Sequence, residues 1–197
     1  MLTAALAVGC VPALAKRGST IDSLSEQITA DVEAGRNAEG LAAAIKLEGL
    51  VRRQQGTQTM NFAGVLHNQG MFLHNLGRYR EAADRLNAAL AIKLRHNDVA
   101  STLRTSNILS ASLMMVERRI EAKTVSERAL ALGSQALGPD DPNLVGPLSA
   151  LGALAREQEN YPDAERFFAR ELAIQRKTPD VAGSAAATDD RGDLYGL

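Results

Sequence analysis

Hydrophobic residues along the chain recur with the period of an α-helix. Those that follow Gly77 lie at positions i, i+4, i+7 and i+8 of one helical face: Ala82, Leu86, Ala89 and Leu90. A second helical pattern precedes Gly77, and a short polar segment separates the two. The stretch therefore predicts two helices joined by a tight turn.

This layout occurs four times. The turns of the four copies begin at Gly35, Gly77, Glu117 and Glu159, with spacings of 42, 40 and 42 residues. Small residues in the first helix recur opposite an alanine in the second: Gly70 with Ala82, Ser110 with Ala122, and Gly152 with Ala164. A steady period of this length is the signature of a helical repeat array, and the small residues indicate close approach of the two helices.

The spacing predicts an all-α fold, a right-handed α-solenoid of antiparallel helix pairs. About four repeats occupy residues 21–177, with residues 21–34 as the first helix, and a half repeat follows them. Helix starts are marked by capping residues, with Asp141 before Pro142 and Asn97 or Asp98 before a helix that begins near residue 99.

The residues of the second copy resemble the tetratricopeptide repeat, in the layout Leu66-x3-Gly70-x2-Leu73-x3-Gly77-x-Tyr79-x2-Ala82. The long period, with "ALGPDDPNL" and "TPDVA" at junctions, is similar to the subgroup found in kinesin light chains and many bacterial proteins. The resemblance covers residues 35–177. Three positions depart from the family pattern, namely Gln69, Arg119 and Glu171. A HEAT-type array has an overlapping period, but small residues in both helices of each pair favour the tetratricopeptide assignment.

The N-terminal segment, residues 1–20, has more than one interpretation. Residues 2–15 are apolar and too short for a bilayer, which needs about 20 residues. They suit a signal peptide that ends at Ala13-Leu14-Ala15, although no Lys or Arg precedes the apolar core. A signal segment with a linker implies export to the periplasm. The alternatives are a frayed hydrophobic helix or a start codon placed late in a longer leader. If residues 1–15 are not a signal peptide, we expect a cytoplasmic protein.

The C-terminal segment, residues 178–197, begins with Thr178-Pro179, as earlier helices begin with a capping residue and proline. It predicts the first helix of an incomplete fifth repeat, or a C-terminal cap. We favour the incomplete repeat, because in a C-terminal cap the apolar residues of this segment would have neighbours on one flank only.

Composition and motifs limit the classes of function that the sequence supports. A net charge of −1 gives no overall field to recruit nucleic acid or an anionic membrane. The single cysteine, Cys10, excludes an intramolecular disulfide framework and any multi-cysteine metal site. The chain has no glycine-rich phosphate loop and no HExxH motif. We therefore predict a protein that is not an enzyme, without cofactor, metal or small-molecule substrate.

The resemblance implies that the first helix of each pair lines a concave groove for partner peptides. By position, the predicted groove residues are His67, Met71, His74, Arg104, Asn107, Met114, Ser149 and Arg156. The alternative is that some of them pack against the adjacent repeat. Asn68 and Arg104 match the family's clamp for chaperone C-termini, but Ser25, Thr29 and Ile108 do not, so that ligand is not predicted.

The function that follows is a scaffold or adaptor that binds a partner peptide or helix. Two alternatives stay open. The chain is the regulatory repeat region of a larger enzyme of the caspase-like peptidase type, or it is a self-assembling structural array.

Overall fold

The computed structural model describes residues 12–177, with side chains from residue 20 onward. Within this range the chain forms eight α-helices and no strand. The first helices of the pairs are α1 (Pro12–Glu33), α3 (Met60–Asn75), α5 (Val99–Met115) and α7 (Val145–Glu157). The second helices are α2 (Asn37–Gln55), α4 (Tyr79–Arg95), α6 (Arg119–Ala136) and α8 (Tyr161–Lys177), and a 3-10 turn, η1 (Pro142–Leu144), precedes α7.

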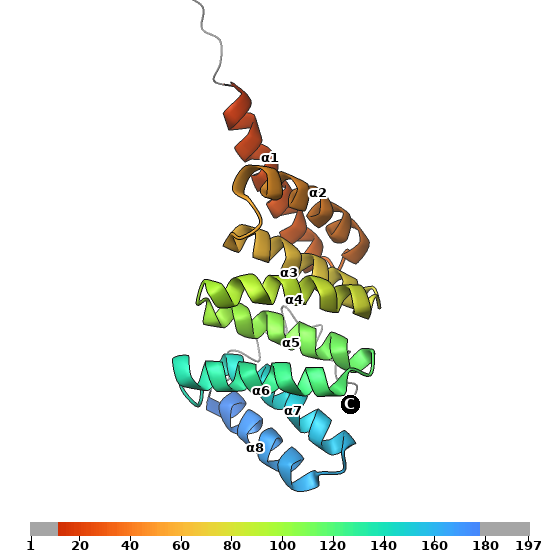
Figure 1. The fold of residues 1–197 in the computed structure, drawn as a ribbon, viewed down its shortest axis with the longest axis vertical. Helices are drawn as coiled ribbons and strands as arrows, with labels where there is room; N and C mark the ends of the chain where they lie inside the picture. The colour runs from red at the N-terminus through yellow and green to blue at the C-terminus, as the bar shows by residue number, and fades with distance from the viewer. Residues whose placement is uncertain (1–11, 178–197) are drawn as a thin grey trace, which may run out of the picture.

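The helices stack in chain order along one axis, as Figure 1 shows. Each helix packs against the next one along the chain, which is the arrangement of an α-solenoid. The predicted all-α solenoid of about four helix pairs is therefore confirmed. Residues 178–197, where the half repeat was predicted, lie outside the described residues.

The first helix begins earlier than the sequence predicted. The prediction placed it at residues 21–34, but α1 runs from Pro12 to Glu33. Proline is favoured at the first position of a helix because its missing N–H has no partner there. Alanine and leucine downstream of Pro12 are good helix formers, so the helix extends beyond its amphipathic part. Cys10 and the rest of residues 1–11 lie outside the described range.

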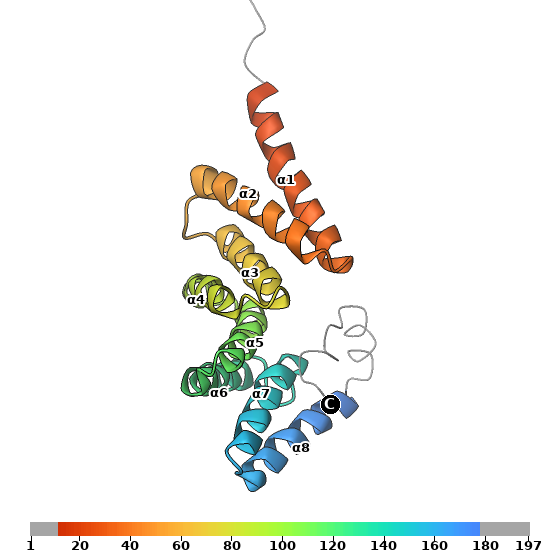
Figure 2. The ribbon, with the colours of Figure 1, turned by 90° about the vertical axis from the view of Figure 1, so that its right-hand side faces the viewer.

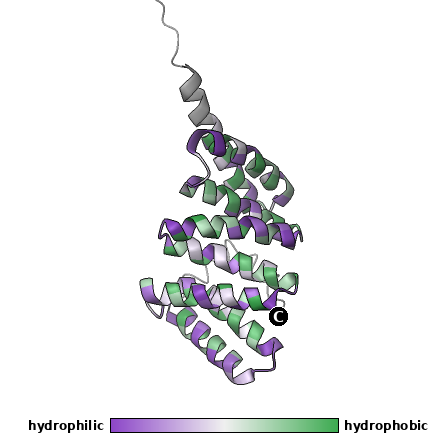
Figure 3. Ribbon diagram, in the orientation of Figure 1, coloured by the Kyte–Doolittle hydropathy of each residue, from purple (hydrophilic) through white to green (hydrophobic). Residues whose placement is uncertain are grey.

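The hydrophobic interior runs almost the full length of the array. One cluster of buried side chains extends from Ile28 on α1 to Leu154 on α7, and a smaller cluster around Leu103, Leu148 and Ile174 joins the last helices. Figure 3 shows apolar and polar residues interspersed along α4, α6 and α8. This is the pattern of helices with a single buried face.

The turn within each helix pair uses one backbone geometry. Gly35, Gly77, Glu117 and Glu159 occupy the same repeat position, and all have positive φ, at 64°, 73°, 64° and 58°. Left-handed backbone is tolerated by glycine and costs other residues about 1–2 kcal/mol. The alignment of the four turns made from sequence is thus a structural equivalence.

Gly77 and Gly64 have equally open surroundings, so substitutions at these two positions distinguish the cost of backbone strain from the cost of packing. No atom lies within 4 Å of a Cβ added at Gly77 or at Gly64, but Gly64 is inside α3 and Gly77 has φ of +73°. We expect Gly77→Ala to lower the free energy of unfolding by about 1 kcal/mol and Gly64→Ala to raise it by about 0.5–1 kcal/mol. Urea unfolding followed by circular dichroism measures both. Equal effects would contradict the assigned turn geometry.

The small residues of the first helices accommodate a side chain of the second. A Cβ at Gly70 would lie 2.4 Å from Leu86, a Cβ at Gly152 would lie 2.5 Å from Phe168, and the Ser110 and Ser126 hydroxyl groups are 2.8 Å apart. In each case the contacting residue lies one helical turn after the alanine that was predicted to be opposite. The Ser110 hydroxyl also donates to the carbonyl of Ala122 at 3.3 Å, so the predicted close approach is present as well.

Gln69, which departs from the family pattern, has a specific role. Its side chain is buried, and its amide Nε2 donates to the Ala44 carbonyl at 3.1 Å and to Glu48 Oε2 at 3.0 Å. Burial acts to raise the pKa of Glu48, but the hydrogen bonds from Gln69 and Arg52 outweigh it and lower that pKa. Gln69 therefore replaces an apolar contact with polar links from α3 to α2.

Side chains of neighbouring repeats pair at a nearly constant separation. Asn75 donates to Asn37, Arg119 donates to Glu157, and Lys177 donates to Asp140, with separations of 37 or 38 residues. Arg119, which stands where the family has tyrosine, thus uses its guanidinium to link α6 to α7. The predicted caps are confirmed at Asp98 and Asp141, whose carboxylates accept from Ser101 N and Asn143 N.

Candidate peptide-binding groove

The first helices of the last three pairs form the inner wall of the array. Within residues 12–177, α5 contacts both α3 and α7 directly, whereas the second helices α4, α6 and α8 contact one another little or not at all. Closer spacing on one side means that this side has the shorter arc and is concave. Figure 2 shows α3, α5 and α7 on the side toward which α1 and α8 lean.

Each inner helix presents one partly accessible stripe. The stripes contain Gly64, His67, Asn68, Met71 and Asn75 on α3; Ala100, Arg104, Asn107 and Met114 on α5; and Gly146, Ser149, Ala153 and Arg156 on α7. Most successive members of a set are three, four or seven residues apart, which keeps each set on one side of its helix. The three stripes together define the candidate groove.

Seven of the eight residues predicted for the groove belong to these stripes. Arg104 and Arg156 are exposed, and the other five are partly buried: His67, Met71, Asn107, Met114 and Ser149. The eighth, His74, is 7% exposed. A partner therefore has access to the arginines and little access to His74.

His74 contributes to the packing between repeats. Its Nδ1 lies 2.9 Å from the Ser112 hydroxyl of α5. Its ring packs against the Tyr79 ring in an edge-to-face arrangement, with the two ring centroids 5.2 Å apart. His74 therefore links α3 to α5, and its side chain is not available to a ligand in the groove. The sequence pattern could not separate His74 from the stripe, because it lies at the correct helical spacing from Met71.

The electrostatic character of the groove is positive. The helices α3 and α5 contain no Asp or Glu, and the only acidic residue of α7, Glu157, accepts from Arg119 on the outer helix α6. Neither Arg104 nor Arg156 has an ion-pair or hydrogen-bond partner among the described residues. The groove therefore offers two guanidinium groups to a ligand.

A buried polar network lies behind the stripe of α3. Lys93 on α4 donates from Nζ to Thr105 Oγ1 at 2.7 Å and to the Ser101 carbonyl at 3.4 Å, and Thr105 Oγ1 is 3.1 Å from His67 Nδ1. Among the residues that the structure describes, no carboxylate is hydrogen-bonded to this network. Burial and the positive charge of Arg104 lower the pKa of Lys93 to about 8. Burial, Lys93 and Arg104 lower the pKa of His67 to about 3.

The sequence contained a signal for this network that its interpretation did not use. Lys93 lies four residues after Ala89, at the next position of the face formed by Ala82 and Leu86. A lysine at a core position of an amphipathic helix needs hydrogen-bond partners when buried. Only the fold shows that Thr105 and Ser101 supply them.

Asn107 marks the contact between α5 and α7. A Cβ on Gly146 would lie 2.0 Å from Asn107 Nδ2, so any side chain at position 146 would displace the Asn107 amide from its place between the two helices. Asn107 Oδ1 is buried without a hydrogen-bond partner among the described residues. Asn107 therefore serves the packing of the groove wall in addition to lining it.

The described residues offer little for other chemistry. No group of three or more His, Cys, Asp or Glu side chains within residues 12–177 is placed to hold a metal ion. None of the helices in that range combines the length and apolar character needed to cross a bilayer.

The fold and the groove define a helical-repeat protein of the solenoid class. Residues 98–177 match the family model for the tetratricopeptide repeat. The matched region spans the last two helix pairs, α5 to α8, and the described residues as a whole have a tetratricopeptide-like solenoid fold of the kinesin-light-chain-like type. Tetratricopeptide repeats generally mediate protein–protein interactions and are typically non-catalytic scaffolds.

Two solved structures share the fold. One contains nearly identical TPR-like repeats of a kinesin light chain protein from Podosopora anserina, with a TM-score of 0.67, 16% identity, and coverage of 89% of this chain and 90% of that chain. The other is BtubC (BKLC) from P. vanneervenii, with a TM-score of 0.61, 16% identity, and coverage of 92% of this chain and 81% of that chain. No curated protein sequence matches the chain significantly.

Proposed function

We propose that the chain is a scaffold or adaptor that binds a segment of a partner protein in the groove formed by α3, α5 and α7. The observation that carries this proposal is the pair of exposed arginines, Arg104 and Arg156, on a wall without a free carboxylate. Such a wall favours a partner segment with acidic side chains or exposed backbone carbonyls.

The mechanism is preorganisation. The inner helices are fixed by contacts that do not depend on a ligand, such as the Gly146–Asn107 contact and the His74–Ser112 hydrogen bond. The receptor therefore loses little conformational entropy on binding, and the partner segment bears most of the ordering cost. Met71 and Met114 add adaptable apolar surface between the polar groups.

The charge of the groove gives a direct test. We expect the double variant Arg104→Glu/Arg156→Glu to weaken partner binding about tenfold or more, because charge-assisted hydrogen bonds contribute about 1.5–3 kcal/mol each. Both side chains are exposed, so helicity should not change. Quantitative affinity capture on immobilised wild-type and variant proteins identifies the partners, and titration calorimetry with the partner segment measures the affinity.

Arg128→Glu is the matched control, since Arg128 is exposed on the outer helix α6 and has no ion pair among the described residues. It should leave the affinity unchanged. If the control abolishes binding while the double variant binds normally, the partner site is on the convex side and the proposal fails.

A further inference from the structure

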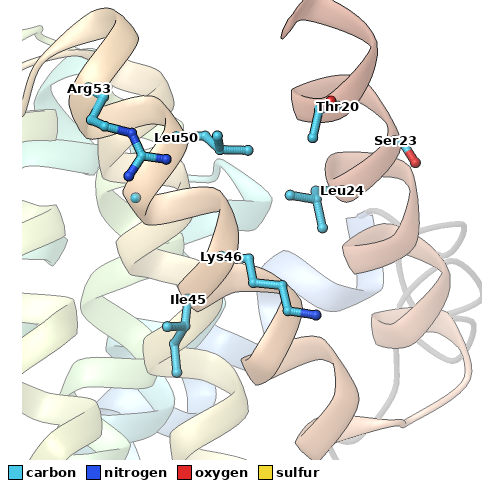
Figure 4. Close-up of a pocket in the computed structure, with 8 residues that line it drawn as sticks. Thr20, Ser23, Leu24, Ile45, Lys46, Leu50 and Arg53 are labelled. Carbon is cyan, nitrogen blue, oxygen red and sulfur yellow. The ribbon is translucent and has the colours of Figure 1, made fainter. Parts of the chain in front are cut away.

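The N-terminal end of the array contains a cleft separate from the groove. Helices α1 and α2 meet at their shared turn and diverge from it, as Figure 2 shows. The cleft between them has a volume of about 870 Å³. It is lined by Thr20, Ser23 and Leu24 of α1 and by Ile45, Lys46, Gly49, Leu50 and Arg53 of α2 (Figure 4).

The cleft is apolar at its base and positively charged on one wall. Leu24 and Leu50 are partly buried, and Ile45 is a large apolar side chain that is 55% exposed. Both charged lining residues, Lys46 and Arg53, are cations without an ion-pair partner among the described residues. The lining contains no acidic side chain.

Gly49 supplies an independent observation. It lies in the interior of α2, where glycine destabilises a helix relative to alanine. A Cβ at Gly49 would meet only the end of the Arg53 side chain, at 3.8 Å, whereas a Cβ at Gly40 of the same helix would lie 2.3 Å from Phe72. Packing within the chain therefore explains Gly40 but leaves Gly49 without an internal reason. A glycine that faces a cleft permits close approach by the backbone of another molecule.

The spacing of the lining residues indicates the shape of the occupant. The lining residues of α2 form a row with steps of one helical turn, namely 45 and 46, then 49 and 50, then 53. Those of α1 form a similar row of residues 20, 23 and 24. Two such rows on diverging helices form a trough that runs along the helix direction. A third helix fits a trough of this kind, in the manner of helix-in-groove recognition.

We propose that this cleft is a second docking site, which binds an amphipathic helix of a partner protein with an apolar face and acidic flanks. Leu24, Ile45 and Leu50 contact the apolar face. Lys46 and Arg53 lie two helical turns apart and pair with carboxylates on one flank. Gly49 allows the backbone of the bound helix to come close to α2.

The probe is a synthetic helical peptide with leucines along one face and glutamates along both flanks. Its counterpart carries lysines in place of the glutamates. Binding to the full chain is followed by NMR through the amide of Gly49 and the methyl groups of Ile45 and Leu50, so that millimolar affinities are detected. We expect the glutamate peptide to shift these signals and the lysine peptide to leave them unchanged.

Three variants test the contacts. Lys46→Glu/Arg53→Glu should reduce the affinity for the glutamate peptide about tenfold or more, and Gly49→Leu should abolish binding without lowering the melting temperature. Gly64→Leu is the matched control, because Gly64 is also a helix-interior glycine with open space around it and lies outside the cleft. It should leave binding unchanged.

The outcomes separate this site from the groove. Arg104→Glu/Arg156→Glu should bind the glutamate peptide as the wild type does, whatever its effect on a groove partner. The proposal is overturned if the glutamate peptide does not shift the cleft signals, if the lysine peptide shifts them equally, or if Gly49→Leu still binds. It is also overturned if sedimentation shows self-association that Gly49→Leu abolishes, because a second copy of the chain then covers the cleft.

Discussion

Gly70→Leu should lower the free energy of unfolding by about 3 kcal/mol, at the upper end of the cost of overpacking a core. A Cβ at this position would lie 2.4 Å from the Leu86 side chain. Leu86 has no exposed surface and is enclosed by the core, so it has nowhere to move. The helices α3 and α4 must then separate, and the contacts between them weaken together. Urea unfolding followed by circular dichroism measures the change.

Gly152→Leu provides the graded comparison. A Cβ there would lie 2.5 Å from Phe168, but Phe168 is only partly buried and its ring can rotate toward solvent. We expect a loss of about 1–2 kcal/mol. A melting temperature unchanged by both substitutions would contradict the assigned repeat register. Equal losses would contradict the account in which the freedom of the opposing side chain sets the cost.

The buried network of Lys93 and His67 should make stability depend on pH in two windows. In the fold the pKa of His67 is about 3, against 6.5 for an unperturbed histidine. The unfolded chain therefore takes up a proton that the fold excludes, and stability is lost as pH falls below 6.5 toward 3. The maximum slope from this one group is about 1.4 kcal/mol per pH unit.

Lys93 affects stability at alkaline pH in the same direction as His67 does at acid pH, so that stability rises with pH. Its pKa of about 8 in the fold lies below the ordinary value of 10.5, so between these limits the unfolded chain holds the proton more firmly. Stability should therefore rise with pH from about 8 to 10.5, as this buried charge is neutralised. Many proteins lose stability in that range, which makes the direction of the effect diagnostic.

Two substitutions separate the contributions, with unfolding free energies measured by urea titration from acid to alkaline pH. His67→Leu should remove the acid-side loss. Lys93→Met should remove the alkaline rise and stabilise the protein near neutral pH, since an apolar chain replaces a buried cation that has no ion-pair partner among the described residues. Thr105 should keep its hydrogen bond to the Ser101 carbonyl in both variants, because that bond, 2.8 Å long in the wild type, involves neither substituted residue. Superimposable pH curves for wild type and variants would show that the network does not titrate as described.

The amino-acid sequence by itself determined the repeat and its local geometry. The four turns at Gly35, Gly77, Glu117 and Glu159 were aligned from their repeated sequence layout and its spacing, and all four have the same left-handed backbone. The helix caps at Asp98 and Asp141 could also be predicted from the sequence, because a cap depends on a side chain and a backbone N–H only two or three residues away. Interactions of this kind are encoded by neighbours in the chain.

The tertiary structure decided which surfaces are available. Helical periodicity gives the angle of a side chain around its helix, but not the neighbour that covers it. His74 and Arg104 both fit the predicted groove by spacing, yet Ser112 of the next repeat covers His74 and nothing described covers Arg104. Lys93 likewise became a buried cation because Thr105 lies within hydrogen-bond distance.

The cleft at the N-terminal end is the clearest case of what the sequence did not show. The sequence placed a helix before Gly35 and a second helix after it, but it gave no angle between them. The face of α2 that stays open to the cleft is decided by how α2 packs on α3 with its other face, including the contact of Gly40 with Phe72 more than thirty residues away. Local patterns therefore specified the repeated unit, whereas packing between units decided its accessible faces, because those faces are defined by residues far apart in the chain.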